Sequence, residues 1–245
     1  MPRRQLRTVD PRIDLTGFLL TPADLPGELS SRALFGNDHP LELEIGSGKG
    51  LFLQNAARLR PEHNFVGIEI AHKYAKAAAA RLARGDCRNA KLIAGDARRL
   101  VAQALPHASL IAVHVYFPDP WWKRKHKKRR VLNEDFLRQL HAALAPGGKL
   151  HFWTDVLEYF EATLELIGEK VPELGVPIPD EPHETEGEGR THFDRRSLRF
   201  AIPVYRVFFQ PDARGFSFSD RTAPEHRTAP EHRSAPVQAP VPAAH

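Results

Sequence analysis

Cysteine and methionine are almost absent from this chain of 245 residues, which contains one of each. The single cysteine, Cys87, excludes an intrachain disulfide and a zinc site built from several cysteines, and it suits a reducing compartment. Long apolar runs are absent too, since none approaches the roughly 18 residues that a membrane-spanning helix requires. We therefore expect neither a disulfide framework nor a transmembrane segment.

The first residues lack the apolar stretch of a secretory signal. Arg3 and Arg4 supply positive charge, but no sustained hydrophobic region comes after them, and Asp10 and Asp14 add negative charge there. The histidines are scattered without the spacing of metal ligands, and His114, on a predicted strand, is interpreted as structural. We expect a cytoplasmic protein that holds no metal and binds no membrane.

Charge is distributed very unevenly along the chain. The 35 Lys and Arg against 30 Asp and Glu give a net charge of +5. Seven of the basic residues lie in the eight-residue segment 123–130, which has no acid, so the remainder of the chain is slightly acidic. A near-neutral body with one concentrated cationic segment indicates a polyanionic partner.

From residue 41 onward, short apolar segments alternate with helical stretches. This alternation predicts right-handed crossovers and a parallel sheet covered by helices on both faces. A late strand, Val204–Gln210, is expected to join antiparallel at the sheet edge. The fold class predicted is α/β, a doubly wound and mostly parallel sheet. The predicted strands are Leu41–Ile45, Asn64–Ile70, Ala90–Ala94, Ser109–Phe117 and Lys149–Thr154, and the predicted helices are about 50–59, 72–84, 97–104, 133–145 and 156–168.

The composition divides the chain into three regions. Residues 1–38 are rich in Arg, Pro and Gly and predict an irregular arm with one short helix near Leu29–Phe35. Residues 39–212 form the α/β domain, in which the proline-containing and acidic stretch 172–190 is expected to be a loop. Residues 213–245 contain two copies of Arg-Thr-Ala-Pro-Glu-His and a Pro/Ala-rich continuation. Because this repeat has no large apolar side chain, we expect a disordered tail.

A glycine loop joins the first predicted strand of this domain to the next helix. The loop reads Gly46-Ser47-Gly48-Lys49-Gly50, and it places permissive backbone at a helix start that offers free N–H groups. Its spacing is neither that of a dinucleotide site nor that of a P-loop. Glu44, just before the loop, would repel a pyrophosphate but attract an ammonium group. We therefore favour S-adenosylmethionine, with Gly46 and Gly48 close to it.

Two more acids lie at the ends of the next two predicted strands. Glu69 ends the second strand, where a carboxylate can accept hydrogen bonds from ribose hydroxyls. Asp96, in Gly-Asp-Ala, comes after the third strand and is placed to reach the adenine end. Three solvated loop acids are the alternative interpretation. Because the carboxyl ends of parallel strands meet at one edge of a sheet, we expect Glu44, Glu69 and Asp96 to converge.

The fourth predicted strand ends in Phe-Pro-Asp-Pro-Trp-Trp, at residues 117–122, directly before the basic segment. Two prolines fix a rigid turn that holds Asp119 at the rim of the sheet. One of Trp121 and Trp122 could pack into the core while the other stacks on a base, or both could pack. For residues 123–130, phosphate binding is favoured over a solvated loop or a localisation signal.

Together these motifs resemble the bacterial tRNA (guanine-N7-)-methyltransferases, a family with the Rossmann-like class I methyltransferase fold. The resemblance covers about residues 41–209 and also includes Pro-Gly-Gly at 146–148 and Thr-Asp at 154–155. Its most specific part is Phe-Pro-Asp-Pro-Trp together with the basic segment after it. The resemblance implies methyl transfer from S-adenosylmethionine to N7 of guanosine 46 in the tRNA variable loop. It implies tRNA as the macromolecular partner. We expect the protein to be a monomer or a homodimer.

The resemblance also assigns site residues. It implies that Asp119 is catalytic and contacts the methyl donor together with Glu44, Glu69 and Asp96, and that Lys123 and Asp155 contact the target nucleotide. A late Thr-x-Phe-Glu motif of the family reads Thr191, His192, Phe193 and Asp194 here, so its acid is one methylene shorter. The residues implied to hold RNA are Lys125, His126, Lys127, Lys128, Arg129 and Arg130.

Two other functions remain open on the sequence. A class I methyltransferase that acts on a protein or a small molecule would keep the cofactor acids but leave the basic segment unexplained. A non-catalytic RNA-binding protein on this fold would bind no methyl donor. For the favoured reaction, guanine N7 needs no strong base, so Asp119 is expected to orient the purine and stabilise its positive charge.

Overall fold

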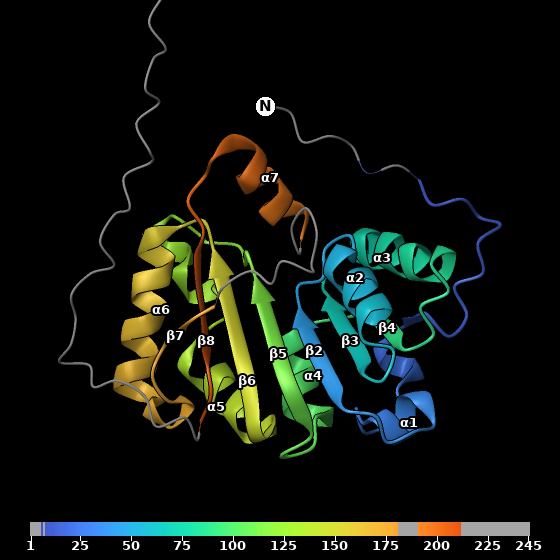
Figure 1. The fold of residues 1–245 in the computed structure, drawn as a ribbon, viewed down its shortest axis with the longest axis horizontal. Coiled ribbons are helices and arrows are strands. Elements are labelled where there is room, and N and C mark those ends of the chain that lie inside the picture. Colours follow the sequence, from blue (N-terminus) through green and yellow to red (C-terminus); the bar gives the residue numbers. More distant parts are fainter. Residues whose placement is uncertain (1–5, 7, 181–190, 212–245) are drawn as a thin grey trace, which may run out of the picture. The chain divides into compact units, whose positions relative to one another are not determined.

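The computed structural model describes Leu6, residues 8–180 and residues 191–211 (Figure 1). The predicted tail, at residues 213–245, and the most acidic part of the predicted loop, at 181–190, lie outside the described residues.

Within the described residues, eight strands form one sheet in the order β1-β4-β3-β2-β5-β6-β8-β7. Neighbours from β1 to β6 are parallel, whereas β8 is antiparallel to both β6 and β7. The order reverses at β2, the switch point at which open α/β sheets bind ligands. The strands are β1 (Leu19–Leu20), β2 (Leu41–Ile45), β3 (Asn64–Glu69), β4 (Ala90–Ala94), β5 (Leu110–Tyr116), β6 (Leu144–Thr154), β7 (Ile178–Pro179) and β8 (Tyr205–Phe209).

Helices cover the sheet on both faces, which confirms the predicted doubly wound architecture (Figure 1). α2 (Leu51–Leu59) and α3 (His72–Arg84) pack on one face. The opposite face carries α4 (Ala97–Ala104), α5 (Glu134–Ala143) and α6 (Leu157–Lys170). The remaining elements are α1 (Ser31–Phe35), α7 (His192–Phe200) and the 3₁₀ turns η1 (Pro22–Asp24), η2 (Arg124–Arg129) and η3 (Pro172–Leu174). No helix of the described part is long and apolar enough to cross a membrane.

β2 is buried on both faces, but its two faces differ in chemistry. Leu41, Leu43 and Ile45 join the apolar core under α4, α5 and α6. Because side chains alternate along a strand, Glu42 and Glu44 lie on the face that carries α2 and α3. Both carboxylates are almost completely buried, at 1% and 4% exposure. The central strand therefore carries two acids that need polar or charged partners.

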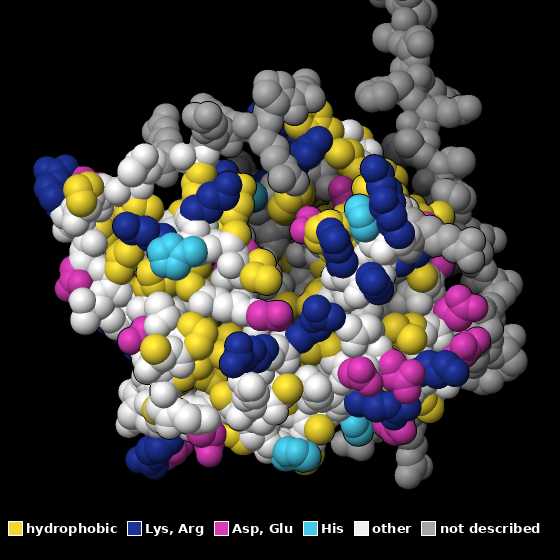
Figure 2. All heavy atoms as spheres, turned by 180° about the vertical axis from the view of Figure 1, so that it is seen from behind, with side chains coloured by type: hydrophobic (Ala, Val, Ile, Leu, Met, Phe, Trp, Pro, Cys, Tyr) yellow, Lys and Arg dark blue, Asp and Glu magenta, His cyan; other side chains and the backbone are white. Residues whose placement is uncertain are grey.

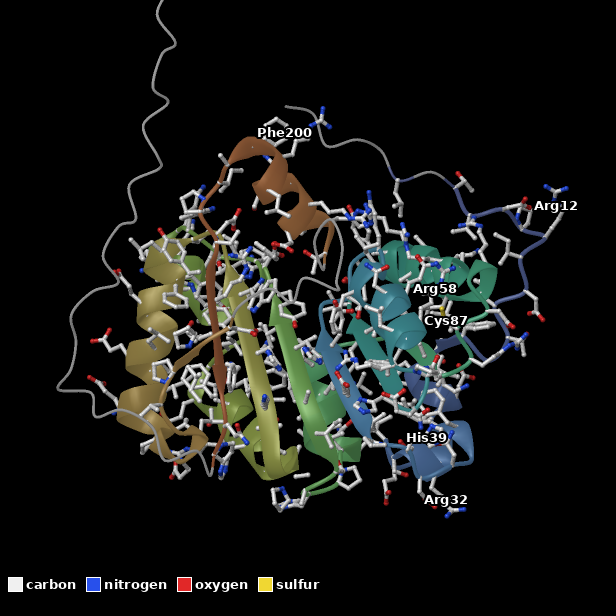
Figure 3. All side chains as sticks on the ribbon, viewed as in Figure 1. Arg12, Arg32, His39, Arg58, Cys87 and Phe200 are labelled. Carbon is white, nitrogen blue, oxygen red and sulfur yellow. The ribbon has the colours of Figure 1, made fainter. Side chains whose placement is uncertain are left out.

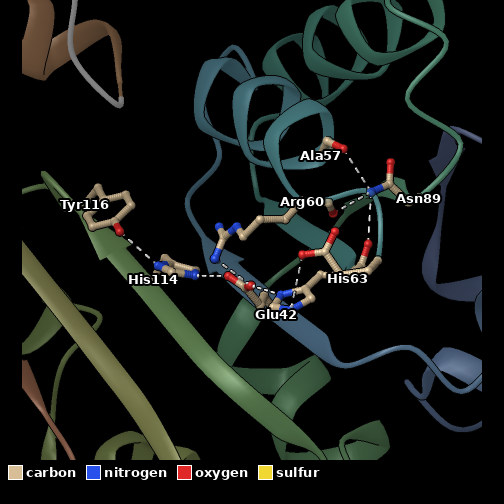
Figure 4. A network of polar contacts seen from close by, with 8 residues as sticks. Glu42, Ala57, Arg60, His63, Asn89, His114 and Tyr116 are labelled. Atoms are coloured by element: carbon tan, nitrogen blue, oxygen red, sulfur yellow. Dashed lines mark hydrogen bonds and ion pairs between the residues drawn. The ribbon is translucent and has the colours of Figure 1, made fainter. Parts of the chain in front are cut away.

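Glu42 is the centre of a buried polar network (Figure 4). Its Oε1 lies 2.8 Å from Arg60 Nη1 and 2.6 Å from His63 Nδ1, and its Oε2 lies 2.7 Å from His114 Nε2. Burial by itself would raise the pKa of Glu42, but His114, Arg60 and His63 lower it to about 2. Burial lowers the pKa of His114 to about 4. His114 is therefore neutral at pH 7; its Nε2 donates to Glu42 and its Nδ1 accepts from the Tyr116 hydroxyl, at 2.8 Å. These contacts give His114 the structural role expected of it.

Three parts of the fold differ from the sequence prediction. The late strand β8 pairs antiparallel with β6, as predicted, but the two-residue β7 pairs outside it, so β8 is the second strand from the edge. β6 begins at Leu144, ahead of a Pro-Gly-Gly sequence that is typical of a turn. The N-terminal arm contains the predicted short helix, α1, but it also contributes β1 to the opposite edge. β1 and β7 are too short to show an alternating pattern.

Candidate functional site

The glycine loop between β2 and α2 packs closely on β3 and α3 at two points. A Cβ on Gly67 of β3 would lie 2.3 Å from Ser47 Oγ, and one on Gly50 would lie 2.7 Å from the Ala78 Cβ. By contrast, Gly46 and Gly48 have φ values of +78° and +53° and would meet no protein atom within 4 Å. β3 and α3 therefore support one side of the loop, while the backbone at Gly46 and Gly48 remains open, as a ligand cradle requires.

Glu44 lies near the end of β2, two residues before this loop, and one of its carboxylate oxygens is unpaired within the described residues. Neither its Oε2 nor the Ser47 hydroxyl forms a hydrogen bond within the described residues. Burial raises the pKa of Glu44 to about 8; nearby Ser47 opposes that shift, and the charge of Glu69 adds to it. A buried carboxylate without a cation is costly, so the site is suited to a ligand that brings an ammonium group.

Glu69 holds the glycine loop against the end of β3. Its Oε2 accepts a hydrogen bond from the Gly48 N–H, and its Oε1 accepts one from the Ala71 N–H, both at 2.8 Å. Each carboxylate oxygen can still accept a second hydrogen bond. Glu69 thus combines loop positioning with the capacity to bind ribose hydroxyls.

Asp96 lies beside a cavity of about 370 Å³ between the first turns of α4 and α5. It caps α4, since its Oδ1 accepts a hydrogen bond from the Arg98 N–H at 3.0 Å. The volume is in the range of small-molecule sites. The sequence predicted Asp96 as a site residue but not the cavity residues that α5 contributes. Helix caps and helix starts occur throughout a fold, so they do not by themselves indicate a site. The other lining residues are Arg98, Arg99, Asn133, Asp135, Phe136 and Gln139.

Asp119 is exposed in a turn with unusual backbone geometry. Phe117 and Trp121, on either side of it, have φ values of +50° and +47°, a region that non-glycine residues seldom adopt. The Phe117 N–H donates to the Trp153 carbonyl at 2.7 Å, and Arg130 Nε donates to the Pro120 carbonyl at 2.9 Å. The turn is therefore held at both ends, and strain of this kind is typical of functional sites.

The basic segment 123–130 divides into bound and exposed cations. Arg130 is only 7% exposed; its guanidinium lies 4.4 Å from the Tyr159 ring centre and 2.6 Å from Glu158. Lys127 also pairs with Glu158, at 2.6 Å. Arg129 lies 5.2 Å over the Trp121 ring, and His126 meets that ring edge-on. Figure 2 shows Lys and Arg side chains beside a hollow in the upper part of the face seen there. The cations left exposed without an ion pair in the described structure are Lys123, Lys125, Lys128 and Arg129.

The late motif lies at the start of α7, an element that the sequence did not predict. Thr191 caps this helix by accepting from the Asp194 N–H at 3.0 Å. The exposed Phe193 stacks on Phe117, with ring centres 5.7 Å apart. Asp194 is buried and pairs with Arg206 at 2.8 Å. The motif is thus brought to the Asp119 turn by Phe193, while Asp194 anchors α7 to β8.

The predicted site residues therefore gather in part at one edge of the sheet. Glu44, Glu69, Asp96 and Asp119 each lie at or just after the carboxyl end of a parallel strand, and Asp155 is exposed just after β6. Arg130 differs from the other predicted RNA contacts, because its guanidinium is used inside the protein. No cluster of His, Cys, Asp and Glu in the described residues could hold a metal ion.

Comparison with known proteins identifies the chain's relatives. Residues 38–186 match the family described as "Putative methyltransferase". The tRNA (guanine-N(7)-)-methyltransferase of Rhodopirellula baltica is 55% identical over 217 residues, which cover 86% of this chain and 80% of that protein. A protein of the same name from Myxococcus xanthus is 40% identical and covers 76% of this chain and 88% of its own. The chain belongs to the tRNA (guanine-N7-)-methyltransferase family. This confirms the family that the sequence motifs predicted.

The fold of this methyltransferase is also found among solved structures. The 16S rRNA methyltransferase KamB has a TM-score of 0.51 and 17% identity, covering 72% of this chain and 90% of that one. This confirms the class I methyltransferase fold. The family makes S-adenosylmethionine the cofactor, and the unpaired oxygen of Glu44 fits its ammonium group.

Arg130 should matter to this methyltransferase chiefly through stability. Arg130→Met removes the bonds to Pro120 and Glu158, so we expect the free energy of unfolding to fall by about 2 kcal/mol. Lys128→Met, which alters an exposed side chain of the same segment, should change it by less than about 0.5 kcal/mol. Urea unfolding measures both. Equal effects of the two substitutions would contradict the structural role of Arg130.

Cofactor binding should release a proton from Glu44. The pKa of about 8 keeps this carboxyl mostly protonated at pH 7, and an ammonium group beside it would lower that pKa. We expect S-adenosylhomocysteine, which keeps the ammonium group, to release close to one proton at pH 7 and to bind more tightly as pH rises from about 6 to 8.

Titration calorimetry in buffers of different ionisation enthalpy measures this proton. Glu44→Gln is the matched control, because it keeps the size of the side chain and removes the titration. Proton release that is absent from the native protein, or unchanged in Glu44→Gln, would disprove the assignment.

Proposed function

We propose that this protein transfers a methyl group from S-adenosylmethionine to N7 of guanosine 46 in the variable loop of tRNA. One observation carries the proposal: the acids for a cationic cofactor and the cations for a polyanion meet at one place. Asp119 lies three residues after the end of β5, at the edge of the sheet where the cofactor acids lie, and Lys123 begins the basic segment four residues later. A methyltransferase for small metabolites has no need of this arrangement.

The chemistry asks mainly for positioning. S-adenosylmethionine supplies an electrophilic methyl group on a sulfonium centre. Guanine N7 has a lone pair and carries no proton, so the protein need not remove one. Asp119 would accept hydrogen bonds from guanine N1–H and its exocyclic amine, which orients N7. The same carboxylate would stabilise the positive charge that arrives on the ring.

Exposed aromatic side chains near Asp119 suit a displaced base. Trp122 is 67% exposed and Phe193 53% exposed, although most large apolar side chains in the described structure are buried. Stacking on an aromatic ring can hold a base that has left its stack in folded RNA. Lys123 and Asp155, both exposed, would contact the target nucleotide from the ends of β5 and β6.

The backbone of the RNA would lie along the exposed cations of segment 123–130. Lys123, Lys125, Lys128 and Arg129 can each neutralise a phosphate and release a counterion. The proposal includes action in the cytoplasm on tRNA as the macromolecular partner.

The experiment that tests this function compares substrate classes. Purified protein with labelled methyl donor is incubated with tRNA, with a protein mixture and with a metabolite mixture. We expect label only in tRNA, recovered as 7-methylguanosine. Label in protein or metabolites instead would favour a different class I methyltransferase, and no transfer together with no binding of S-adenosylhomocysteine would indicate a non-catalytic RNA-binding protein.

A further inference from the structure

A second group of cations lies away from the segment 123–130. Arg81 of α3 donates from Nε to the Lys49 carbonyl at 2.9 Å and from Nη1 to Gln54 Oε1 at 3.2 Å. Its Nη2 lies 3.4 Å from His192 Nε2 on α7. Arg195 lies three residues after His192, on the same side of that helix. The glycine loop, α3 and α7 thus bring together Lys49, Arg81 and Arg195, which we name the α3–α7 cluster.

The α3–α7 cluster is rich in positive charge and has no carboxylate partner among the described residues. No ion pair joins Lys49, Arg81 or Arg195 to a carboxylate within the part of the chain that is described. Burial and the charges of Arg81, Lys49 and Arg195 lower the pKa of His192 to about 4. Burial, Arg195 and Arg84 likewise lower the pKa of Arg81. Like charges held together without a counter-charge are unfavourable, and an anionic ligand would relieve that cost.

The position of the cluster fits the same RNA that would contact segment 123–130. α7 reaches the Asp119 turn through the Phe193–Phe117 stack and reaches α3 through His192 and Arg81. Segment 123–130 adjoins the same turn from its other end. Cations therefore lie on two sides of the turn that carries the proposed catalytic acid. At the far end of α7, Phe200 points outward (Figure 3).

We propose that Lys49, Arg81 and Arg195 form a second phosphate-binding site, which holds the tRNA backbone on the side of the target nucleotide opposite segment 123–130. This inference rests on the proposed function for the identity of the RNA. Two phosphate sites would fix the register of the strand between them, whereas one site would leave it free to pivot.

The test is the salt dependence of tRNA binding. Arg195→Gln is the central variant because the Arg195 side chain is exposed and forms no hydrogen bond or ion pair in the described structure. We expect the slope of log K against log[salt] to become shallower by about 0.7–0.9, the loss of one phosphate contact, and Arg195→Lys to keep the native slope. Lys49→Gln keeps the carbonyl that binds Arg81, and with Arg195→Gln it should remove about 1.4–1.8 of the slope.

Arg32→Gln is the matched control. Arg32 is also exposed, but it lies on α1 at the opposite end of the molecule from Phe200 (Figure 3). A native slope in Arg195→Gln, or an equal change in Arg32→Gln, would overturn the second site. Weaker binding of S-adenosylhomocysteine with an unchanged tRNA slope would overturn it as well, since the cluster would then serve the cofactor's carboxylate.

A different measurement tests the proposed function. Native protein that binds tRNA but yields no 7-methylguanosine would refute the reaction, while the salt slopes would still decide whether the α3–α7 cluster binds phosphate.

Discussion

Asp119→Asn should lower kcat by about 100- to 1,000-fold with tRNA and S-adenosylmethionine both saturating. The substitution keeps the shape of the side chain but removes the charge that would stabilise the methylated guanine ring. Loss of one preorganised electrostatic group typically lowers kcat by this amount. The amide also presents N–H donors where the guanine edge offers donors of its own. Single-turnover kinetics measure the chemical step directly.

The Asp119 substitution should leave the fold unchanged, because the side chain is exposed. Asp86→Asn is the matched control, since Asp86 is another exposed aspartate in a turn with positive φ, its own value being 48°. It should keep native kcat. Near-normal turnover of Asp119→Asn under saturating conditions would show that Asp119 is not the charge-stabilising group.

Glu42→Ala should lower the free energy of unfolding by about 3–5 kcal/mol, the usual cost of removing one partner from a buried charged network. The substitution leaves the buried His114 and the Arg60 guanidinium without their shared carboxylate. Glu42→Gln keeps an acceptor oxygen, so its free energy of unfolding should lie between those of Glu42→Ala and the native protein. Glu62→Ala, at an exposed position close in sequence, should change stability by less than about 0.5 kcal/mol. Urea unfolding at pH 7 distinguishes these outcomes, and equal losses for Glu42→Ala and Glu62→Ala would contradict the network's role.

The same network predicts how stability depends on pH. The pKa of His114 is about 4 in the folded protein and near 6.5 when unfolded, so the unfolded chain binds the extra proton between these values. Stability should therefore fall as pH drops from about 6.5 to 4. The Glu42 pKa of about 2, against 4.5 unfolded, extends the loss from about pH 4.5 to 2.

Glu44 acts in the opposite direction on stability. Its folded pKa of about 8 favours the protonated form, so its contribution falls as pH rises from about 4.5 to 8. Unfolding at several pH values in His114→Gln and Glu44→Gln separates the two. Each substitution should flatten the profile in its own window, and a profile unchanged by both would refute these assignments.

The sequence predicts the parts of this fold that carry long or repeated signals. The strands β2 to β6 and the helices between them are predicted by the alternation of apolar segments, and the acids at 44, 69, 96 and 119 by their places at strand ends. α7 was missed because its nine residues include three arginines and no continuous apolar face. Its helical start is set by a single cap, Thr191.

Side-chain partners were less predictable than elements. Arg130 belongs to a run of basic residues, and nothing in that run shows that its guanidinium is bound to Glu158, 28 residues away in sequence. Glu42 is one of two acids in an otherwise apolar strand. Its sequence position does not indicate its partners, Arg60, His63 and His114, because only the folded sheet brings them together. Tertiary contacts of this kind have no local signature.

The most direct test of the whole account maps the methylated base in one tRNA. Transcribed tRNA with guanosine at position 46 and a matched transcript with adenosine there are each treated with native protein and S-adenosylmethionine, then cleaved chemically at 7-methylguanosine. The account predicts donor-dependent cleavage at position 46 of the first transcript and none in the second. Cleavage at another guanosine, or in neither transcript, would contradict it.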